Sequence, residues 1–320
     1  MLICIARSAV SAPAIAPQTS VSLRGDVAHP TELSGLAFHG DLLIACPDEG
    51  AELNVFRRAD DAYGLLAKVS LLEDAGDEID MEAAASDGEH LYVVGSHSMR
   101  RKKVDDASAY KKNRKRLTRV RPHDESYRLF RLAVNGAGVL ESNESLSLAN
   151  LLADDEILGP YAAIPGKENG VDVEGLAVKD GRLYVGFRGP VLRGNFVPVL
   201  SFAFDDPDDY ELKFVPLAGR GIRDLLAVDD GLLLLAGPIG DGDATYKLYH
   251  WNGEDCVPGD VESPGVLTEL GELPGNQAVK PEGLAILAET ADSWKLLVVS
   301  DGDADASTWL VQKPGHPPPR

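Results

Sequence analysis

Short apolar stretches recur along the chain, and a polar turn separates one from the next. The clearest copy reads Asp-Val-Glu-Gly-Leu-Ala-Val at residues 172–178, then Asp-Gly at 180–181, then Leu-Tyr-Val-Gly-Phe-Arg at 183–188. An Asp-Gly pair between two apolar runs is a strong signal for a β-hairpin. The pattern therefore predicts two antiparallel strands joined by a tight turn at this place.

The same phrase occurs five times, beginning near residues 32, 80, 172, 222 and 281. Further strand-like runs follow each copy, and four strands in a unit of roughly 50 residues are typical of a β-propeller. We predict a single all-β domain over residues 1–320, a five-bladed β-propeller closed by an N-terminal strand. The last unit lacks its outer strand, which residues 19–23 supply. A sixth, degenerate blade between residues 135 and 170 is the alternative.

Charge is distributed unevenly along this chain. The net charge is −20, yet eleven of the 31 lysines and arginines lie between residues 100 and 121. We predict a basic inserted loop over residues 100–126 and a disordered, proline-rich tail over residues 312–320. An acidic surface repels phosphates, so nucleic acid is disfavoured as a partner. No apolar run reaches the ~20 residues that span a bilayer, so we expect no membrane partner.

Cysteine usage bears on the compartment. The three cysteines lie far apart and have no metal-type spacing. An odd, sparse count argues against a disulfide framework and favours a cytoplasmic location.

Acidic residues gather where the predicted first strands begin. In a propeller these openings meet the exits of the second strands at one mouth of the central channel, because the two strands are antiparallel. The openings carry Glu32, Asp80, Glu82, Asp172, Glu174, Asp224 and Glu282. Crowded carboxylates repel one another, and either a cation or nearby arginines can relieve them. Calcium binds several oxygen ligands, including carboxylates, and is the cofactor that we expect here. Its expected ligands are Glu32, Glu82, Glu174 and Glu282.

Two carboxylate pairs are candidates for general acid–base catalysis. Asp80/Glu82 and Asp172/Glu174 each have i, i+2 spacing, which places both members on one face of a strand. Carboxylates in such a group have separated pKa values, as acid–base catalysis requires. His97 follows a strand exit beside the acids and is the third candidate, although a lone histidine is more often structural.

Three arginines are candidates for ligand binding. Arg188 and Arg193 lie in a loop that glycine and proline hold close to a strand exit, and Arg100 begins the basic insertion. Guanidinium groups suit bidentate binding of carboxylates or phosphates. The alternative is that these arginines only neutralise the acids.

Three phrases carry a resemblance to a known family. They are Asp-Val-Glu-Gly-Leu-Ala with Gly-Phe-Arg-Gly-Pro, Asp-Met-Glu-Ala with Gly-Ser-His-Ser, and Pro-Glu-Gly-Leu-Ala. Over residues 30 to 303 the chain resembles an uncharacterised bacterial family catalogued as domain of unknown function 3616. This resemblance implies a propeller and no particular activity. More distantly, Glu-Gly-Leu-Ala is similar to phrases in phytase-like esterase and SdiA-regulated propellers. The long basic insertion departs from the family pattern.

Two functions are consistent with these residues. In the first, an acidic, arginine-flanked pocket at the channel mouth binds a small anionic ligand and acts as a calcium-dependent ester or phosphoester hydrolase. In the second, the protein is a non-enzymatic scaffold whose acidic face or basic loop docks a protein partner.

Overall fold

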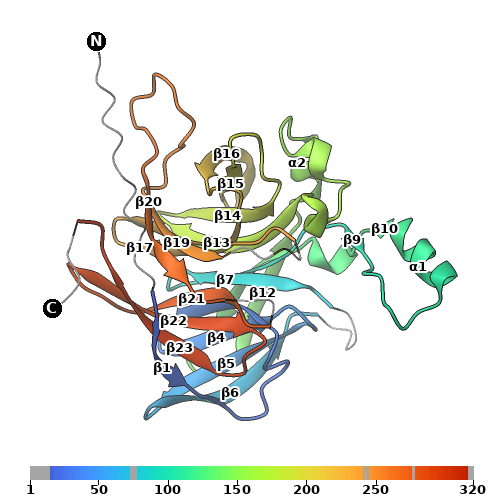
Figure 1. Ribbon diagram of the computed structural model, residues 1–320. Helices are drawn as coiled ribbons and strands as arrows, with labels where there is room; N and C mark the ends of the chain where they lie inside the picture. Colours follow the sequence, from blue (N-terminus) through green and yellow to red (C-terminus); the bar gives the residue numbers. More distant parts are fainter. Residues whose placement is uncertain (1–14, 73–77, 241, 243–244, 276–277, 316–320) are drawn as a thin grey trace.

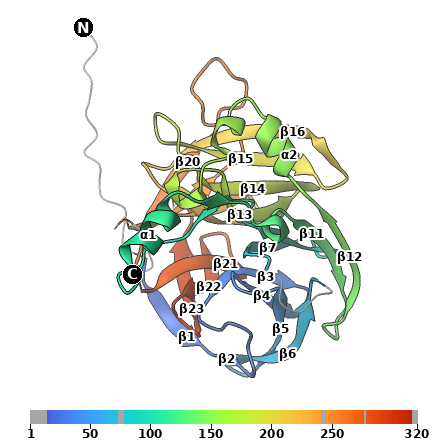
Figure 2. The same ribbon diagram turned by 90° about the vertical axis from the view of Figure 1, so that its right-hand side faces the viewer.

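Five antiparallel sheets surround a central axis in the computed structural model (Figures 1 and 2). The structure describes residues 15–315, except residues 73–77, 241, 243–244 and 276–277. In each of the five blades the strand that carries the repeated sequence lies innermost, and the next two strands of that blade in chain order step outward from it. This arrangement confirms the predicted five-bladed β-propeller. The region of the alternative sixth blade contains the end of the second sheet and short helical segments instead.

The first two blades come from the N-terminal part of the chain. The first contains, from the channel outward, β3 (Leu33–His39), β4 (Leu42–Pro47), β5 (Glu52–Ala59) and β6 (Ala62–Ser70). A short strand, β2 (Leu23–Arg24), pairs in parallel with β6. The second contains β7 (Met81–Ser86), β8 (Leu91–Gly95), β11 (Leu129–Val134) and β12 (Leu140–Leu146).

The remaining blades follow the same order. The third contains β13 (Asp172–Lys179), β14 (Arg182–Gly189), β15 (Phe196–Ala203) and β16 (Asp206–Pro216). The fourth contains β17 (Gly221–Val228), β18 (Gly231–Gly237), β19 (Tyr246–Trp251) and β20 (Leu267–Leu273). The fifth contains β21 (Lys280–Glu289), β22 (Ser293–Asp301), β23 (Ala306–Gln312) and, as its outermost strand, β1 (Pro17–Val21). β1 pairs antiparallel with β23.

Two connections contain helices. Between β8 and β11 lie β9 (Arg100–Arg101), α1 (Tyr110–Leu117), β10 (Val120–Arg121) and a 3₁₀ turn, Asp124–Ser126. We call residues 99–123 the basic arm; it projects from the face at which β8 ends (Figures 1 and 2). Between β12 and β13 lie α2 (Ala149–Asp154) and the 3₁₀ turns Gly159–Tyr161 and Gly166–Glu168. No helix within the described residues is long and apolar enough to cross a membrane.

The apolar residues pack mainly between neighbouring blades. Because a blade contacts another blade on each face, its second strand is largely buried, as in β18, where all seven residues are buried. The innermost strands approach one another closely, so small residues are needed there. A Cβ on Gly175 would lie only 2.9 Å from the side chain of Ile222 in the next blade. β23 extends to Gln312, and residues 316–320 of the predicted disordered tail lie outside the described residues.

Candidate functional site

All five innermost strands have a β-bulge at the same position. In each, the pairing register with the second strand shifts around one extra residue. A bulge redirects the side chain of the extra residue. We call these residues the bulge ring, in chain order Ser34, Glu82, Glu174, Arg223 and Glu282. We call the end of the channel that contains the ring the charged mouth.

Ion pairs connect the bulge ring across the third, fourth and fifth blades. Arg188 donates through Nε to Asp172 Oδ2 at 2.9 Å, and its Nη1 lies 2.5 Å from Glu174 Oε1. The Nη1 of Arg223 lies 2.8 Å from Glu174 Oε2, and its Nη2 contacts Glu282. All five side chains are at most 10% exposed. The result is an alternating chain of three carboxylates and two guanidinium groups.

The pKa of Asp172 is raised to about 6 even though Arg188 binds it. Burial raises this pKa, and it outweighs the opposing effect of Arg188. A carboxylate pair of this kind titrates closer to neutral pH than an exposed carboxylate does.

The first and second blades contribute ring residues without partners. Ser34 is 1% exposed, and its Oγ has no hydrogen-bond partner in the described part of the chain. The Glu82 carboxyl likewise has neither a hydrogen bond nor an ion pair among the described residues. Burial, together with the charges of Glu174 and Asp80, raises the pKa of Glu82 well above its ordinary value. Buried polar groups such as Ser34 Oγ normally have partners, and Glu82 is partly exposed, so this side of the ring is where a ligand or water would bind.

Arg223 carries a further buried group without a partner. Its Nη groups bind Glu174 and Glu282, but its Nε has no acceptor in the described residues. Within the described residues, the ring thus combines an ion-paired half with donors that have no acceptor and one carboxyl group that has no partner.

A second level of acidic side chains lies at the rim of the charged mouth. Asp80 accepts a hydrogen bond from Ser96 and contacts Arg100, whose other Nη group lies 3.3 Å from Glu78. Beside them, the pKa of Asp48 is raised to about 7 by burial and by the charges of Asp80 and Asp301. One Asp48 carboxylate oxygen is buried without a partner among the described residues. Near neutral pH, Asp48 therefore carries a proton part of the time.

Asp224 lies deeper than the sequence-based prediction placed it. Its register position is the one that Gly175 occupies in the third blade, one residue past the bulge. Its carboxylate accepts hydrogen bonds from the backbone N–H of Leu225 at 2.8 Å and of Leu284 at 2.7 Å. The backbone N–H of Leu176 is a third donor. Asp224 therefore links the innermost strands of three blades instead of joining the acids at the opening.

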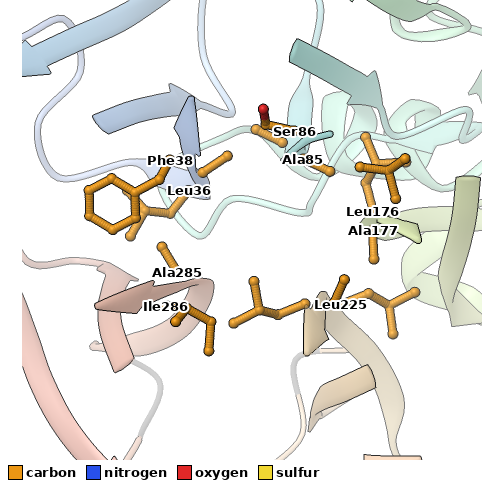
Figure 3. A pocket seen from close by; sticks show the side chains of 14 residues that line it. Leu36, Phe38, Ala85, Ser86, Leu176, Ala177, Leu225, Ala285 and Ile286 are labelled. Atoms are coloured by element: carbon orange, nitrogen blue, oxygen red, sulfur yellow. The ribbon is translucent and has the colours of Figure 1, made fainter. Parts of the chain in front are cut away.

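The opposite end of the channel is apolar. A cavity of about 160 Å³ lies between the far ends of the innermost strands. Figure 3 shows Leu36, Phe38, Leu176, Leu225 and Ile286 around it. The lining side chains at this end are apolar except for Ser86, and the charged side chains described above lie at the charged mouth.

The predicted carboxylate pairs differ in their environment. Asp172 and Glu174 both bind Arg188, so the structure brings this pair together. Asp80 binds Arg100 and Ser96, whereas Glu82 stays unpaired within the described residues. Strand alternation predicts that residues i and i+2 point to the same side of the strand. A β-bulge lies within each pair and shifts the register, so this simple rule does not hold here.

His97 lies away from the unpartnered groups of the ring. It is 2% exposed, its Nδ1 donates to Gly95 O at 2.8 Å, and its Nε2 accepts from Leu148 N at 3.3 Å. Burial lowers the pKa of His97 to about 4. Both ring nitrogens of the neutral imidazole are used, so we assign it no step in the proposal below.

The other predicted residues are spread over the rim. Arg193 is exposed in the loop between β14 and β15, with no ion-pair partner in the described part of the chain. Glu32 Oε2 lies 3.3 Å from His29 Nδ1, which lies 3.6 Å from Glu49 Oε2. These three are the one group of ligand-type side chains that the described residues place within 4.8 Å of one another.

Three of the four predicted calcium ligands, Glu82, Glu174 and Glu282, lie in the bulge ring, but the four do not form one group of ligand atoms within 4.8 Å among the described residues. Glu174 and Glu282 bind arginines, Glu32 lies beside His29, and Glu82 has no partner among the described residues.

Sequence reasoning missed two members of the bulge ring. Arg223 and Ser34 occupy the positions that glutamates occupy in the other three copies. An alignment of the five phrases on their apolar residues, which places Arg223 opposite Glu174, would have identified both.

These features define a five-bladed propeller with a charged channel mouth. The chain belongs to the family described as Protein of unknown function (DUF3616), whose model matches residues 32–145 and 134–310. No curated protein matches the chain. The likeness to phytase-like esterase and SdiA-regulated propellers stays a prediction.

Solved structures resemble the chain in fold. Glutaminyl cyclase from Myxococcus xanthus is 12% identical, with 95% of this chain and 99% of that chain covered and a TM-score of 0.50. A putative 6-phosphogluconolactonase from Bacteroides uniformis is 14% identical, with 82% and 64% covered and a TM-score of 0.39. At these identities the likeness concerns the fold alone.

Proposed function

We propose that the charged mouth binds a small anionic ligand and hydrolyses an ester or phosphoester bond in it, with Glu82 as general acid–base. The observation that carries this proposal is the environment of Glu82. It lacks a partner among the described residues, whereas the other charged ring members are ion-paired. A carboxyl group with a raised pKa can take a proton from the attacking water and return it to the leaving oxygen.

The neighbouring ring residues support this role. Ser34 Oγ and Arg223 Nε are buried groups without acceptors in the described part of the chain. Both can donate a hydrogen bond to a carbonyl or phosphoryl oxygen of the ligand. The ion pairs hold Arg223 in place, so this donor needs little reorganisation when charge develops on that oxygen.

Calcium is part of this proposal as a cation for the carboxylates that no arginine holds. Glu32 and Glu49 at the rim are oxygen donors of this type, and with His29 they form a group whose ligand atoms lie within 4.8 Å of one another. Carboxylate oxygens of this kind suit a hard cation. When bound, calcium would supply a Lewis acid at the rim for a carbonyl or phosphoryl oxygen.

Hydrolysis can be tested with p-nitrophenyl acetate, p-nitrophenyl phosphate and bis(p-nitrophenyl) phosphate. We expect turnover of at least one, and a loss of about 10²- to 10⁴-fold in Glu82→Gln. Glu52→Gln, at an exposed position of β5, serves as the matched control and should keep full activity. Equal activity in Glu82→Gln and the wild type would remove Glu82 from the mechanism.

Calcium binding has its own test. A cation that binds only the folded state raises the thermal midpoint by mass action. We expect added calcium to raise the midpoint of the wild type relative to EDTA, and Glu32→Gln to reduce this rise. A wild-type midpoint that does not respond to calcium would exclude this part of the proposal and leave the acid–base role intact.

A non-enzymatic scaffold is the second candidate function. Helix α1 favours it, because none of its eight residues is buried and its last turn carries Arg114, Lys115 and Arg116. Deletion of residues 102–121 separates the two functions. A scaffold that docks through the arm loses its partner, whereas a hydrolase keeps turnover of the neutral probe p-nitrophenyl acetate.

A further inference from the structure

Among the described residues, the guanidinium groups at the bulge ring are ion-paired through their Nη groups, and Arg223 Nε is the donor that they leave for an anionic ligand. The Nη groups of Arg188 and Arg223 are bound to Asp172, Glu174 and Glu282. Two arginines face three carboxylates, so this half of the ring is not positively charged. A ligand with several negative charges therefore needs positive side chains from elsewhere.

The basic arm carries such side chains. Seven of its cations are exposed and have no acidic partner in the described part of the chain: Lys102, Lys111, Lys112, Arg114, Lys115, Arg119 and Arg121. Helix α1 contains four of them, and none of its residues is buried. A helix with no buried residue presents its charges to solvent. These cations are available to a ligand.

The base of the arm is fixed to the rim of the charged mouth. Arg100 contacts Asp80, and Arg101 Nε lies 2.5 Å from Glu168 Oε1. The backbone N–H of Gly166 donates to Met99 O at 3.1 Å. The Asp172 carboxylate lies so close to Gly166 that it leaves no room for a Cβ. The arm thus begins beside Asp80 and is held near Asp172, on the face that Figure 2 turns toward the viewer.

We propose that the basic arm recognises the phosphate groups of the ligand, so that the charged mouth acts on small molecules with several phosphate charges. This inference rests on the proposed function of the mouth. A small polyanion is favoured over nucleic acid for two reasons. The remainder of the chain is strongly acidic and repels a long polyanion, and Tyr110 is the sole aromatic residue of the arm, which leaves little surface for base stacking.

The test is calorimetric titration of the full chain with inorganic tripolyphosphate. The arm variant combines Lys111→Ala, Lys112→Ala, Arg114→Ala and Lys115→Ala, because alanine preserves the helix. The control variant has the same change of charge at exposed sites on the blades: Arg24→Ala, Arg57→Ala, Arg58→Ala and Lys295→Ala. We expect the arm variant to lose on the order of tenfold or more in affinity, and the control to change little.

A second readout connects the arm with the mouth. The arm variant should raise the KM for p-nitrophenyl phosphate and leave the KM for neutral p-nitrophenyl acetate unchanged. If no probe is hydrolysed by the wild type, the proposed hydrolase function fails, whereas loss of tripolyphosphate binding in the arm variant still supports the arm as the phosphate-binding element.

Three results would overturn the inference. Tripolyphosphate affinity could be the same in the wild type and the arm variant, or the control could lose as much as the arm variant. A single-stranded RNA oligonucleotide could also bind the arm far more tightly than tripolyphosphate, which would assign the arm to nucleic acid.

Discussion

At the scale of single residues, Glu174 holds the ion-paired half of the charged mouth together. Its Oε1 binds Arg188 from β14, and its Oε2 binds Arg223 from β17. One carboxylate thus links the third blade to the fourth. Glu174 is 2% exposed and therefore shielded from water. Without its carboxylate, the positive charges of Arg188 and Arg223 would each lose one negatively charged partner.

Glu174→Ala should therefore destabilise the protein strongly. Removal of one partner of a buried ion pair costs about 3–5 kcal/mol, because the remaining charge stays buried. Urea unfolding at neutral pH measures this loss. Glu52→Ala, at an exposed position, is the control and should change the unfolding free energy by less than about 0.5 kcal/mol. If the two variants unfold at the same urea concentration, the ion pairs do not contribute to stability.

Asp48 should make stability depend on pH. Its pKa is about 7 in the folded protein, above its ordinary value of 3.8. Between these pH values the folded state keeps a proton that the unfolded state has lost, so the free energy of unfolding falls as pH rises. Asp48→Asn cannot ionise and should lose less stability between about pH 5 and about pH 8. Urea unfolding at both pH values tests this, and an identical pH dependence in the two proteins would show that Asp48 is not the group responsible.

At the scale of elements, the repeated β-bulge creates the site. Each innermost strand places its extra residue at the same level of the channel, so residues far apart in the sequence become neighbours. Arg223 and Glu282, for example, are 59 positions apart and form an ion pair. The five blades therefore act together as one frame for the bulge ring.

Strand β1 covers the outer edge of the last blade, and its removal should have a measurable cost. A chain that starts at residue 22 leaves the outer edge of β23 unpaired, and an open strand edge promotes aggregation. We expect a lower thermal midpoint and more light scattering on heating. A chain that starts at residue 15 keeps β1 and is the control. Equal midpoints in the two truncated chains would mean that the β1 pairing is not needed to hold the propeller closed.

The fold could be predicted from the sequence because its signals are local. Apolar runs recur in each unit, Asp-Gly joins the first two strands in three of the five, and four strands per unit define a blade. The partners of Arg188 and Arg223 could not be predicted in the same way. Their ion pairs depend on bulges, which strand alternation does not reveal, and Arg223 pairs with carboxylates of two neighbouring blades. The position of Asp224 could not be predicted for the same reason. The bulge at Arg223 places Asp224 at the register position that Gly175 occupies in the third blade.

At the scale of the whole molecule, charge is separated in two ways. The channel is charged at one end and apolar at the other, where the cavity of Figure 3 lies. The basic arm stands on the charged face, although the chain as a whole has a net charge of −20. The positive potential of the arm attracts anions to one place on a surface that otherwise repels them. An anionic ligand is thereby directed to the mouth that contains Glu82.

The role of Glu82 is the central claim, and the pH dependence of hydrolysis tests it most directly. For whichever p-nitrophenyl probe the wild type hydrolyses, a carboxyl group with a raised pKa should produce an inflection above the ordinary carboxylate range, and Glu82→Gln should abolish both the inflection and most of the turnover. If Glu82→Gln keeps the wild-type rate and pH profile, or if no probe is turned over at any pH, the account of the charged mouth as a hydrolytic site is wrong.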